Sequence, residues 1–212
     1  MAVGGDLRPE ILLDAYAHGI FPWPIDAHSP MVWASPDPRG IFEFDRIHIP
    51  RSLMRLLRGG RFEVTCDRDF AAVIRGCASA GDRSAATWIT PAMTRAYLRL
   101  HRLGFAHSVE VWEAGQLAGG VYGVALAGLF AAESMFYVRS NASKVGLMHL
   151  LYHLRARGYR LVDIQMLTPV TQALGACEIP RGEYLRRLAA ALQQPADFGT
   201  ALDLSGAPWR RV

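Results

Sequence analysis

Polar and hydrophobic positions alternate along the stretch RLVDIQML. In a strand, where side chains have a period of two, Val162, Ile164 and Met166 point to one face. Asp163 and Gln165 then point together to the other face. Aspartate is disfavoured in strands, so it occurs here against local propensity. The alternation leaves two interpretations open: a strand with one solvated face, or a strand whose polar face is a functional site.

Three further strands are predicted in the middle of the chain, at 108–113, 117–126 and 129–138. The segments between them contain Ala-Gly-Gln and Ala-Gly, which form turns, so an antiparallel meander is expected. The stretch RFEVTC at 61–66 predicts one more strand before the meander.

Helices are predicted where apolar residues recur every three or four positions. Most of these segments follow a cap residue or a proline and end at a glycine. The predicted helices begin near Pro9, after Asp67 or Asp69, after Thr90, after Ser140 or Asn141, and before Leu185.

The segment GIFPWPIDAHSPMVWASPDPRG is dense in proline and aromatic residues. Proline fixes φ and removes a backbone donor, so this segment is predicted to lack regular structure. Two tryptophans on such a loop, Trp23 and Trp33, are more often anchors of the loop than ligand contacts. We expect an N-terminal domain at 1–60 that carries this loop, and a second domain at 61–212.

The formal charge of the 212 residues is +4, a mild basic bias that permits a nucleic-acid partner without requiring one. Nearly all of the positive charge is arginine, and Lys144 is the only lysine. Three cysteines, Cys66, Cys77 and Cys177, form no CxxC pattern. They are expected to be reduced thiols rather than a disulfide frame or a zinc site.

The beginning of the chain, MAVGGDLRPE, lacks a basic segment followed by an apolar one, the pattern of a secretory signal. The longest apolar run, at 119–132, is rich in glycine and shorter than the ~20 residues that a membrane helix needs. We therefore expect a soluble, cytoplasmic protein without a membrane partner.

From residue 88 onward the predicted order is helix, three antiparallel strands, helix, strand, helix. This order resembles the core of the GCN5-related N-acyltransferases, so the expected fold class is α/β (α+β), with a small N-terminal α+β domain. In that fold, the strands before and after the central helix lie side by side and then splay to admit an activated acyl group. The resemblance places 129–138 and 160–167 at one cleft.

Most members of that superfamily bind coenzyme A through a glycine-containing turn at the central helix. In the corresponding stretch, RSNASK, Ala142 and Lys144 occupy the glycine positions. A pyrophosphate cradle is therefore not expected, and a different activated acyl carrier should be sought. Lys144 is left with two interpretations: it meets RNA phosphate, or it structures the turn.

Short blocks in a fixed order cover nearly the whole chain and resemble the signature blocks of leucyl/phenylalanyl-tRNA–protein transferases. This resemblance implies transfer of leucine or phenylalanine from aminoacyl-tRNA to proteins that begin with Arg or Lys, which marks them for degradation. The resemblance also implies that neither coenzyme A nor another cofactor is used, and we expect the enzyme to act as a monomer. The blocks are GGDL (4–7), GIFPWP (19–24), SPDPR (35–39), TWIT (87–90), ESMF (133–136), ASK (142–144), DIQ (163–165) and LGACEIPR (174–181).

The resemblance implies that Asp163 and Gln165 are catalytic, with Gln165 hydrogen-bonded to the attacking amine. Asp163 then either orients this contact and draws away positive charge, or holds the cationic side chain of the acceptor. Glu133 lies among apolar residues and needs a partner, because burial of an unpaired carboxylate is very costly. That partner is an internal arginine or, as the resemblance implies, the cation of the acceptor or the α-ammonium of the donor.

The resemblance also implies an apolar pocket for the leucyl or phenylalanyl side chain, made of residues that would otherwise be predicted as ordinary core. The 3′-terminal adenosine of the tRNA is expected to stack on Trp23 and Trp88. The predicted pocket residues are Val121, Phe130, Met135, Leu147, Leu154 and Val162.

Two positions depart from the family pattern. Ala34 follows Trp33 where the family often has a second aromatic residue, and the ring lost there is expected to affect the preference between Phe and Leu. Tyr137 replaces a commoner serine. His149 and His153 have the spacing of a zinc pair, but Leu150 stands where HExxH has glutamate, and no metal site is predicted. The alternatives to the transferase are a coenzyme A-dependent N-acetyltransferase and a non-catalytic RNA-binding protein.

Overall fold

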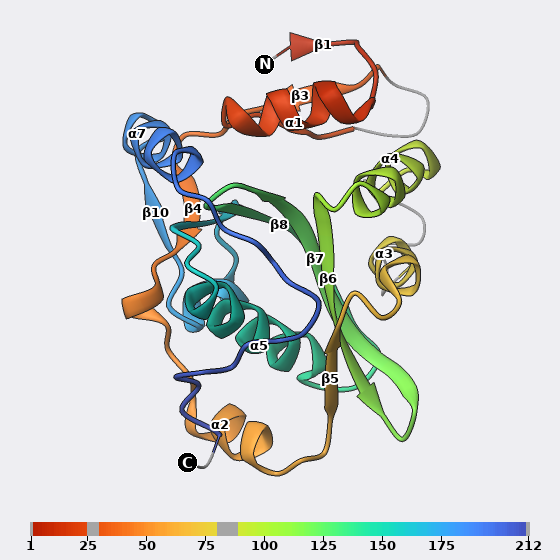
Figure 1. Cartoon of the computed structure of the whole chain (residues 1–212), viewed down its shortest axis with the longest axis vertical. Helices are drawn as coiled ribbons and strands as arrows, with labels where there is room; N and C mark the ends of the chain where they lie inside the picture. Colours follow the sequence, from red (N-terminus) through yellow and green to blue (C-terminus); the bar gives the residue numbers. More distant parts are fainter. Residues whose placement is uncertain (1, 25–29, 80–88, 211–212) are drawn as a thin grey trace.

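A mixed sheet of seven strands runs through the computed structural model, which describes residues 2–24, 30–79 and 89–210. The strand order is β10-β4-β9-β8-β7-β6-β5, with helix α5 on one face and helices α3 and α4 on the other (Figure 1). The strands are β4 (Arg39–Phe42), β5 (Glu63–Cys66), β6 (Ala106–Glu113), β7 (Gln116–Leu126), β8 (Leu129–Tyr137), β9 (Leu161–Gln165) and β10 (Cys177–Ile179).

The helices that the sequence pattern predicts are all present, and short elements are added between them. The unpredicted helical elements are the 3₁₀ turn η1, helix α2 and helix α6, and strands β4 and β10 of the seven-stranded sheet were not predicted either. The helical elements are α1 (Pro9–Ala17), η1 (Phe44–Arg46), α2 (Arg51–Arg58), α3 (Phe70–Ser79), α4 (Pro91–Arg102), α5 (Ala142–Ala156), α6 (Pro169–Ala173) and α7 (Arg181–Leu192).

The proline-rich segment after Gly19 is more regular than predicted. It contributes β2 (Phe21–Pro22) and β3 (Val32–Ala34), which form a small antiparallel sheet with β1 (Ala2–Val3). The prediction of a segment without regular structure is therefore wrong for these residues. Proline is tolerated here because these strands are very short and Pro22 lies in β2, at the edge of the small sheet.

The predicted meander is confirmed. Strands β6, β7 and β8 pair antiparallel in sequence, α5 follows, and β9 returns parallel to β8. This is the arrangement expected for a GCN5-related N-acyltransferase-like fold, and it confirms the predicted fold class. Strand β4, which precedes the meander in sequence, joins the same sheet by pairing with β9.

Alternation along β7 divides the interior into two cores. Val121 packs in an apolar cluster under α5, whereas its neighbour Tyr122 packs under α3 and α4. Both side chains are at most 2% exposed, so successive residues of the strand are buried on opposite faces. A sheet covered on both faces explains the nearly continuous apolar run at 119–132 without a membrane helix. Among the described residues, no helix has the length and apolar character needed to cross a bilayer.

The cap predictions are confirmed in two cases of three. The Thr90 hydroxyl accepts a hydrogen bond from the Met93 N–H, and Asp69 accepts one from the Ala72 N–H. At α5 the N-cap position belongs to Asn141 as predicted, but its side chain forms no cap hydrogen bond. Its φ of +67° instead identifies a left-handed turn, a conformation that asparagine tolerates better than most residues.

Alternation along β9 holds only up to Gln165. Val162 and Ile164 pack against the cluster under α5, and Asp163 and Gln165 are buried on the opposite side. Met166 was predicted to share the face of Val162, but it is 44% exposed because the strand ends at Gln165.

Candidate active site

Strands β8 and β9 separate after three pairs of residues. They are paired from Leu129–Leu161 to Ala131–Asp163, and β8 then continues to Tyr137 paired with β7 alone. The predicted splay is therefore present, and each strand carries a polar residue two positions past the last pair. These residues are Glu133 on β8 and Gln165 on β9.

A β-bulge sets the position of Glu133. The pairing of β7 with β8 shifts from Tyr122–Ser134 to Gly123–Ala132, so Glu133 is the extra residue. A Cβ atom on Gly123 would lie 2.3 Å from the Ala131 carbonyl oxygen, and only glycine allows this close approach. The bulge gives Glu133 an orientation that an uninterrupted strand would not provide.

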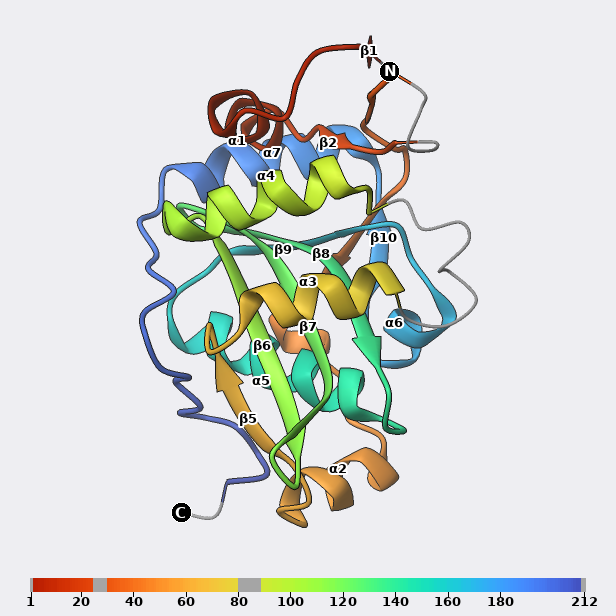
Figure 2. The same ribbon diagram turned by 90° about the vertical axis from the view of Figure 1, so that its right-hand side faces the viewer.

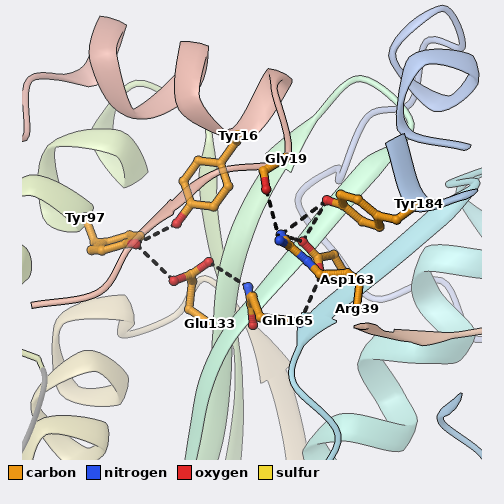
Figure 3. A network of polar contacts seen from close by, with 8 residues as sticks. All are labelled: Tyr16, Gly19, Arg39, Tyr97, Glu133, Asp163, Gln165 and Tyr184. Atoms are coloured by element: carbon orange, nitrogen blue, oxygen red, sulfur yellow. Dashed lines mark hydrogen bonds and ion pairs between the residues drawn. The ribbon is translucent and has the colours of Figure 1, made fainter. Parts of the chain in front are cut away.

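The carboxylate of Glu133 is the centre of a chain of hydrogen bonds (Figure 3). Its Oε1 accepts from the Gln165 amide at 3.2 Å, and its Oε2 accepts from the Tyr97 hydroxyl at 2.9 Å. The Tyr97 oxygen lies 2.6 Å from the Tyr16 oxygen. Because Tyr97 has one hydroxyl proton and gives it to Glu133, Tyr16 is the donor to Tyr97.

Burial raises the pKa of the Glu133 carboxyl to about 7, although the hydroxyls of Tyr16 and Tyr97 act in the opposite direction by stabilising the ionised form. Burial also raises the pKa of both tyrosines well above 10, so they remain donors. Glu133 therefore changes charge near neutral pH, while its two phenolic partners do not.

Asp163 is fully enclosed by donors. Its Oδ1 accepts from Arg39 Nε at 2.9 Å and from the Gln165 N–H at 2.9 Å. Its Oδ2 accepts from Arg39 Nη2 at 2.6 Å and from the Tyr184 hydroxyl at 2.9 Å. These four hydrogen bonds occupy the acceptor positions of a carboxylate, whose exposure here is 0%. Asp163 thus faces the interior and has no free lone pair.

Arg39 links this carboxylate to the N-terminal segment. Its Nη1 donates to the Gly19 carbonyl oxygen at 2.9 Å, and its guanidinium lies over the rings of Phe21 and Tyr184, 5.0 Å and 4.4 Å from their centroids. Burial opposes its charge, but the hydrogen bonds and charge of Asp163 outweigh burial and raise the pKa of Arg39. The guanidinium therefore stays charged inside the protein.

Gln165 has a backbone conformation that is rare for a residue with a side chain. Its φ is +58°, and the Met166 N–H donates to the Ile164 carbonyl oxygen at 2.6 Å, which closes a γ-turn around it. The contact from the Gln165 N–H to Asp163 holds this turn. Gly40 on the neighbouring strand leaves room for it, since a Cβ there would lie 2.9 Å from the Met166 carbonyl carbon. Strained backbone of this kind is concentrated at functional sites.

Comparison with known proteins gives the family of the chain. The model of the leucyl/phenylalanyl-tRNA protein transferase family matches residues 41–189, and the model of its N-terminal domain matches residues 5–37. The chain belongs to the leucyl/phenylalanyl-tRNA–protein transferase family. These transferases include proteins from Anaeromyxobacter dehalogenans strain 2CP-C, 51% identical over 98% of this chain and 90% of the relative, and from Pseudomonas putida, 51% identical over 92% and 86%.

Solved structures are similar only in part. L-PGS from Bacillus licheniformis has a TM-score of 0.46 at 11% identity, over 77% of this chain and 54% of that chain. A ribosomal-protein-alanine N-acetyltransferase from Brucella melitensis has a TM-score of 0.36 at 17% identity, over 53% and 84%. Membership of the transferase family disfavours the alternative of a coenzyme A-dependent N-acetyltransferase.

The six predicted pocket residues of the family site belong to one apolar region. Five of them are at most 2% exposed within the cluster under α5, and Met135 is partly buried against it. Trp23 is also partly buried and meets Phe21 edge to face, with ring centroids 6.0 Å apart. Trp88 lies outside the described residues.

Sequence reasoning missed four residues of the network: Tyr16, Arg39, Tyr97 and Tyr184. Arg39 ends the SPDPR block, but its partner Asp163 is 124 residues away. A signal was available, since a carboxylate predicted on a buried strand needs a cation. The sequence gives no indication of a polar role for the three tyrosines, because each lies on the apolar face of a helix and is predicted as a core residue.

The two histidines of α5, His149 and His153, are buried. His149 lies 5.1 Å from the ring of Trp209, and Nδ1 of His153 accepts from the Asp203 N–H at 2.9 Å. Burial lowers the pKa of His149 to about 4 and also lowers that of His153. Both residues therefore hold the C-terminal segment in their neutral forms.

Proposed function

We propose that the protein transfers leucine or phenylalanine from aminoacyl-tRNA to the α-amine of proteins that begin with Arg or Lys. The observation that carries this proposal is the contact between Glu133 and Gln165 across the splayed strands, in a chain of the transferase family. The donor ester is already activated, so an amide forms and the 3′-oxygen of the tRNA leaves without input from ATP.

In the proposed step, the amine nitrogen attacks the ester carbonyl carbon and forms a tetrahedral intermediate. Collapse of this intermediate breaks the bond to the 3′-oxygen of the tRNA, which leaves with a proton that the amine loses. The α-amine has an ordinary pKa of roughly 7.7–8.0, so a neutral fraction is present near pH 7. The protein then has to hold the amine against the ester in a geometry in which the amine proton passes to the departing 3′-oxygen.

Gln165 is the group proposed to hold the amine. Its amide nitrogen already donates to Glu133, which leaves the amide oxygen as an acceptor for the N–H of the nucleophile. The γ-turn and the Asp163 contact fix the backbone from which this side chain extends. Asp163 is therefore proposed to position Gln165 rather than to bind the acceptor or take a proton itself.

Glu133 is proposed to hold positive charge. In the described residues, its carboxylate is hydrogen-bonded to Tyr97 and Gln165 and forms no ion pair with an arginine. The interpretation of an internal salt bridge is thus not supported, and a cation of the substrates fits the site. The α-ammonium of the donor or the side chain of the acceptor Arg or Lys would stabilise the ionised carboxylate.

Apolar and aromatic residues are proposed to bind the other parts of the donor. The apolar region around Phe130 and Met135 is proposed to take the leucyl or phenylalanyl side chain. Trp23 and Trp88 are proposed to stack on the terminal adenosine. The enzyme is proposed to act as a monomer.

The test is to incubate the protein with radiolabelled Phe-tRNA and a protein that begins with Arg, without ATP or coenzyme A. Label is expected in the acceptor, and an acceptor with an acetylated N-terminus is expected to remain unlabelled. Transfer that proceeds equally to the acetylated acceptor, or that requires coenzyme A, would refute the proposal. Glu133→Gln is expected to raise the KM for the acceptor.

A further inference from the structure

One edge of strand β8 is open beyond the point where β9 ends. The pairs between the two strands stop at Ala131–Asp163, and the γ-turn at Gln165 interrupts β9. Strand β8 continues to Tyr137 and keeps β7 on its other side. Figure 2 shows this last part of β8 beside β7, with α6 near its end. Within the described ranges, this length of strand therefore has a neighbouring strand on one side only.

The backbone groups that face the open side belong to Met135 and Tyr137. The Val138 N–H donates to the Ala118 carbonyl oxygen at 2.8 Å, so the pair that contains Tyr137 is a non-hydrogen-bonded one. The two types of pair alternate along an antiparallel ladder, and Met135, two positions earlier, belongs to the same type. The N–H and C=O groups of both residues thus point away from β7. In the part of the chain that the structure describes, these groups have no hydrogen-bond partner.

Exposed apolar side chains lie in the two segments that follow the splay. Seven large apolar side chains are exposed in the described residues, and four of them are Tyr137, Val138, Met166 and Val170. The two segments approach one another, because Val170 lines a hollow of about 250 Å³ together with Asn141 at the beginning of α5. Apolar surface beside an unpaired strand edge is typical of a place where another chain binds.

The chemistry of this edge favours a peptide as its occupant. An extended peptide presents N–H and C=O groups at the spacing of a strand, whereas the sugar–phosphate backbone of RNA has no such row of donors. The Glu133 carboxylate, two residues before Met135, fits the cationic end of a peptide that begins with Arg or Lys. Gln165 is proposed to hold the amine of that peptide, so the residues after the amine start at this edge.

We infer that the acceptor protein binds as an added strand, parallel to β8, in the place that β9 leaves free; the inference rests on the proposed function. Counted on from the pair Ala131–Asp163, Gln165 is level with Glu133. An acceptor that starts just beyond Gln165 has its second residue level with Met135.

This register assigns each hydrogen bond of the added strand. In a parallel ladder, a residue donates to the carbonyl before its opposite number and accepts from the N–H after it. Met135 therefore donates to the carbonyl of acceptor residue 1 and accepts from the N–H of acceptor residue 3. Tyr137 binds acceptor residues 3 and 5 in the same way. The N–H groups of acceptor residues 2 and 4 point away from β8, and no contact depends on a side chain after the first.

The test uses pentapeptide amides that begin with Arg as acceptors and Phe-tRNA as the donor. One peptide carries a methyl group on the backbone nitrogen of residue 3, and the matched control carries it on residue 4. Each methyl group removes one N–H and restricts the backbone, so a difference between the peptides reports which N–H faces the enzyme. The methyl group on residue 3 is expected to raise the KM on the order of ten-fold, because the Met135 carbonyl loses its donor. The methyl group on residue 4 should leave the KM unchanged.

Three outcomes would overturn the inference: the same KM for all three peptides, an equal increase for both methylated peptides, or an increase for residue 4 alone. The first outcome is the one expected if the 3′ end of the tRNA occupies this edge instead.

A pair of enzyme variants tests the same contact from the other side. Tyr137→Pro removes the ring and the outward N–H, which a strand edge tolerates, and Tyr137→Ala removes the ring alone. The KM for the pentapeptide should be higher in the proline variant. The KM for arginyl-alanine amide, which is too short to reach Tyr137, should be the same in both. Equal values for the pentapeptide in two folded variants would contradict the added strand.

Peptide binding without the donor separates the inference from the proposed function. The Kd of each peptide is measured by calorimetry in the absence of tRNA. If wild-type protein transfers nothing while methylation of residue 3, but not of residue 4, raises the Kd, the proposed function fails and the added strand stands. If transfer proceeds and the two methylated peptides have the same KM, the added strand fails by itself.

Discussion

Arg39 and Asp163 form an ion pair with two hydrogen bonds, 2.6 Å and 2.9 Å long, between side chains that are 1% and 0% exposed. A buried pair of this kind fixes geometry, because each charge is desolvated and neither can leave without exposing the other. In this protein it joins the N-terminal segment, through Gly19, to the strand that carries Gln165.

Removal of Arg39 is expected to be strongly destabilising, since it leaves Asp163 buried without its cation. Arg39→Met should lower the free energy of unfolding by about 3–5 kcal/mol, measured by urea denaturation. The matched control is Arg8→Met, whose partner Asp6 lies at the surface with a side chain 52% exposed. That loss should be below about 1 kcal/mol, and equal losses would contradict the role given to burial.

Substitutions of Gln165 are expected to differ in stability but to lose activity alike. A residue other than glycine at a positive φ costs about 1–2 kcal/mol, so Gln165→Gly should be about 1 kcal/mol more stable than Gln165→Ala. Both variants lack the amide and should lose most of their transfer activity. Thermal unfolding and single-turnover transfer measure the two effects. An alanine variant as stable as the glycine variant would show that the turn is not strained.

The activity is expected to depend on pH through two groups. The acceptor amine must be neutral, and Glu133, whose raised pKa is about 7, must be ionised to hold a cation. Both conditions fail as the pH falls, so log(kcat/KM) for the acceptor should approach a slope of 2 below pH 7. In Glu133→Gln the slope should be 1, because only the amine titrates.

Tyr97→Phe provides the companion variant to this pH profile. It removes a hydroxyl that donates to Glu133 and that favours the ionised carboxylate. The pKa of Glu133 should therefore rise, and the part of the profile that reports Glu133 should move to higher pH. The pKa that belongs to the acceptor amine in this profile should not change. A profile identical to that of the wild type would exclude Glu133 as the second titrating group.

Acid is expected to loosen the C-terminal segment at His149. Its pKa in the folded state is lowered from 6.5 to about 4, so the folded protein disfavours the protonated ring. Its contribution is fully present above about pH 6.5 and is lost as the pH falls toward 4, which amounts to about 3 kcal/mol. Trp209, 5.1 Å away, reports the change by fluorescence. His18→Gln, at an exposed position, should leave this dependence unchanged, whereas His149→Phe should remove the part that comes from His149 and leave the part that comes from His153.

The regular part of the fold could be predicted because local pattern and tertiary structure agree. The meander, α5 and β9 follow from alternation and from cap signals that act within a few residues. The site was predicted only where polar residues break an apolar pattern, as Glu133, Asp163 and Gln165 do. The bulge at Glu133 and the turn at Gln165 depend on Gly123 and Gly40, residues on neighbouring strands, and a single sequence does not indicate which strands are neighbours.

The role of Arg39 was not predicted from the sequence. Its strand is short and follows a proline, so local pattern gave it no role, although a buried aspartate requires a cation. The choice among the many arginines of the chain depends on the pairing of β4 with β9. Arg39 is the partner of Asp163 because the two strands are neighbours in the sheet, which residue type alone does not indicate.

The polar network draws on residues from Tyr16 on α1 to Tyr184 on α7, so almost the entire polypeptide contributes to it. A chain still emerging from the ribosome lacks Tyr184 and the last helix, and Asp163 in such a chain is missing one of its donors. A partial chain that ends before α7 thus cannot close the network, and the site is complete only when both ends of the polypeptide have met.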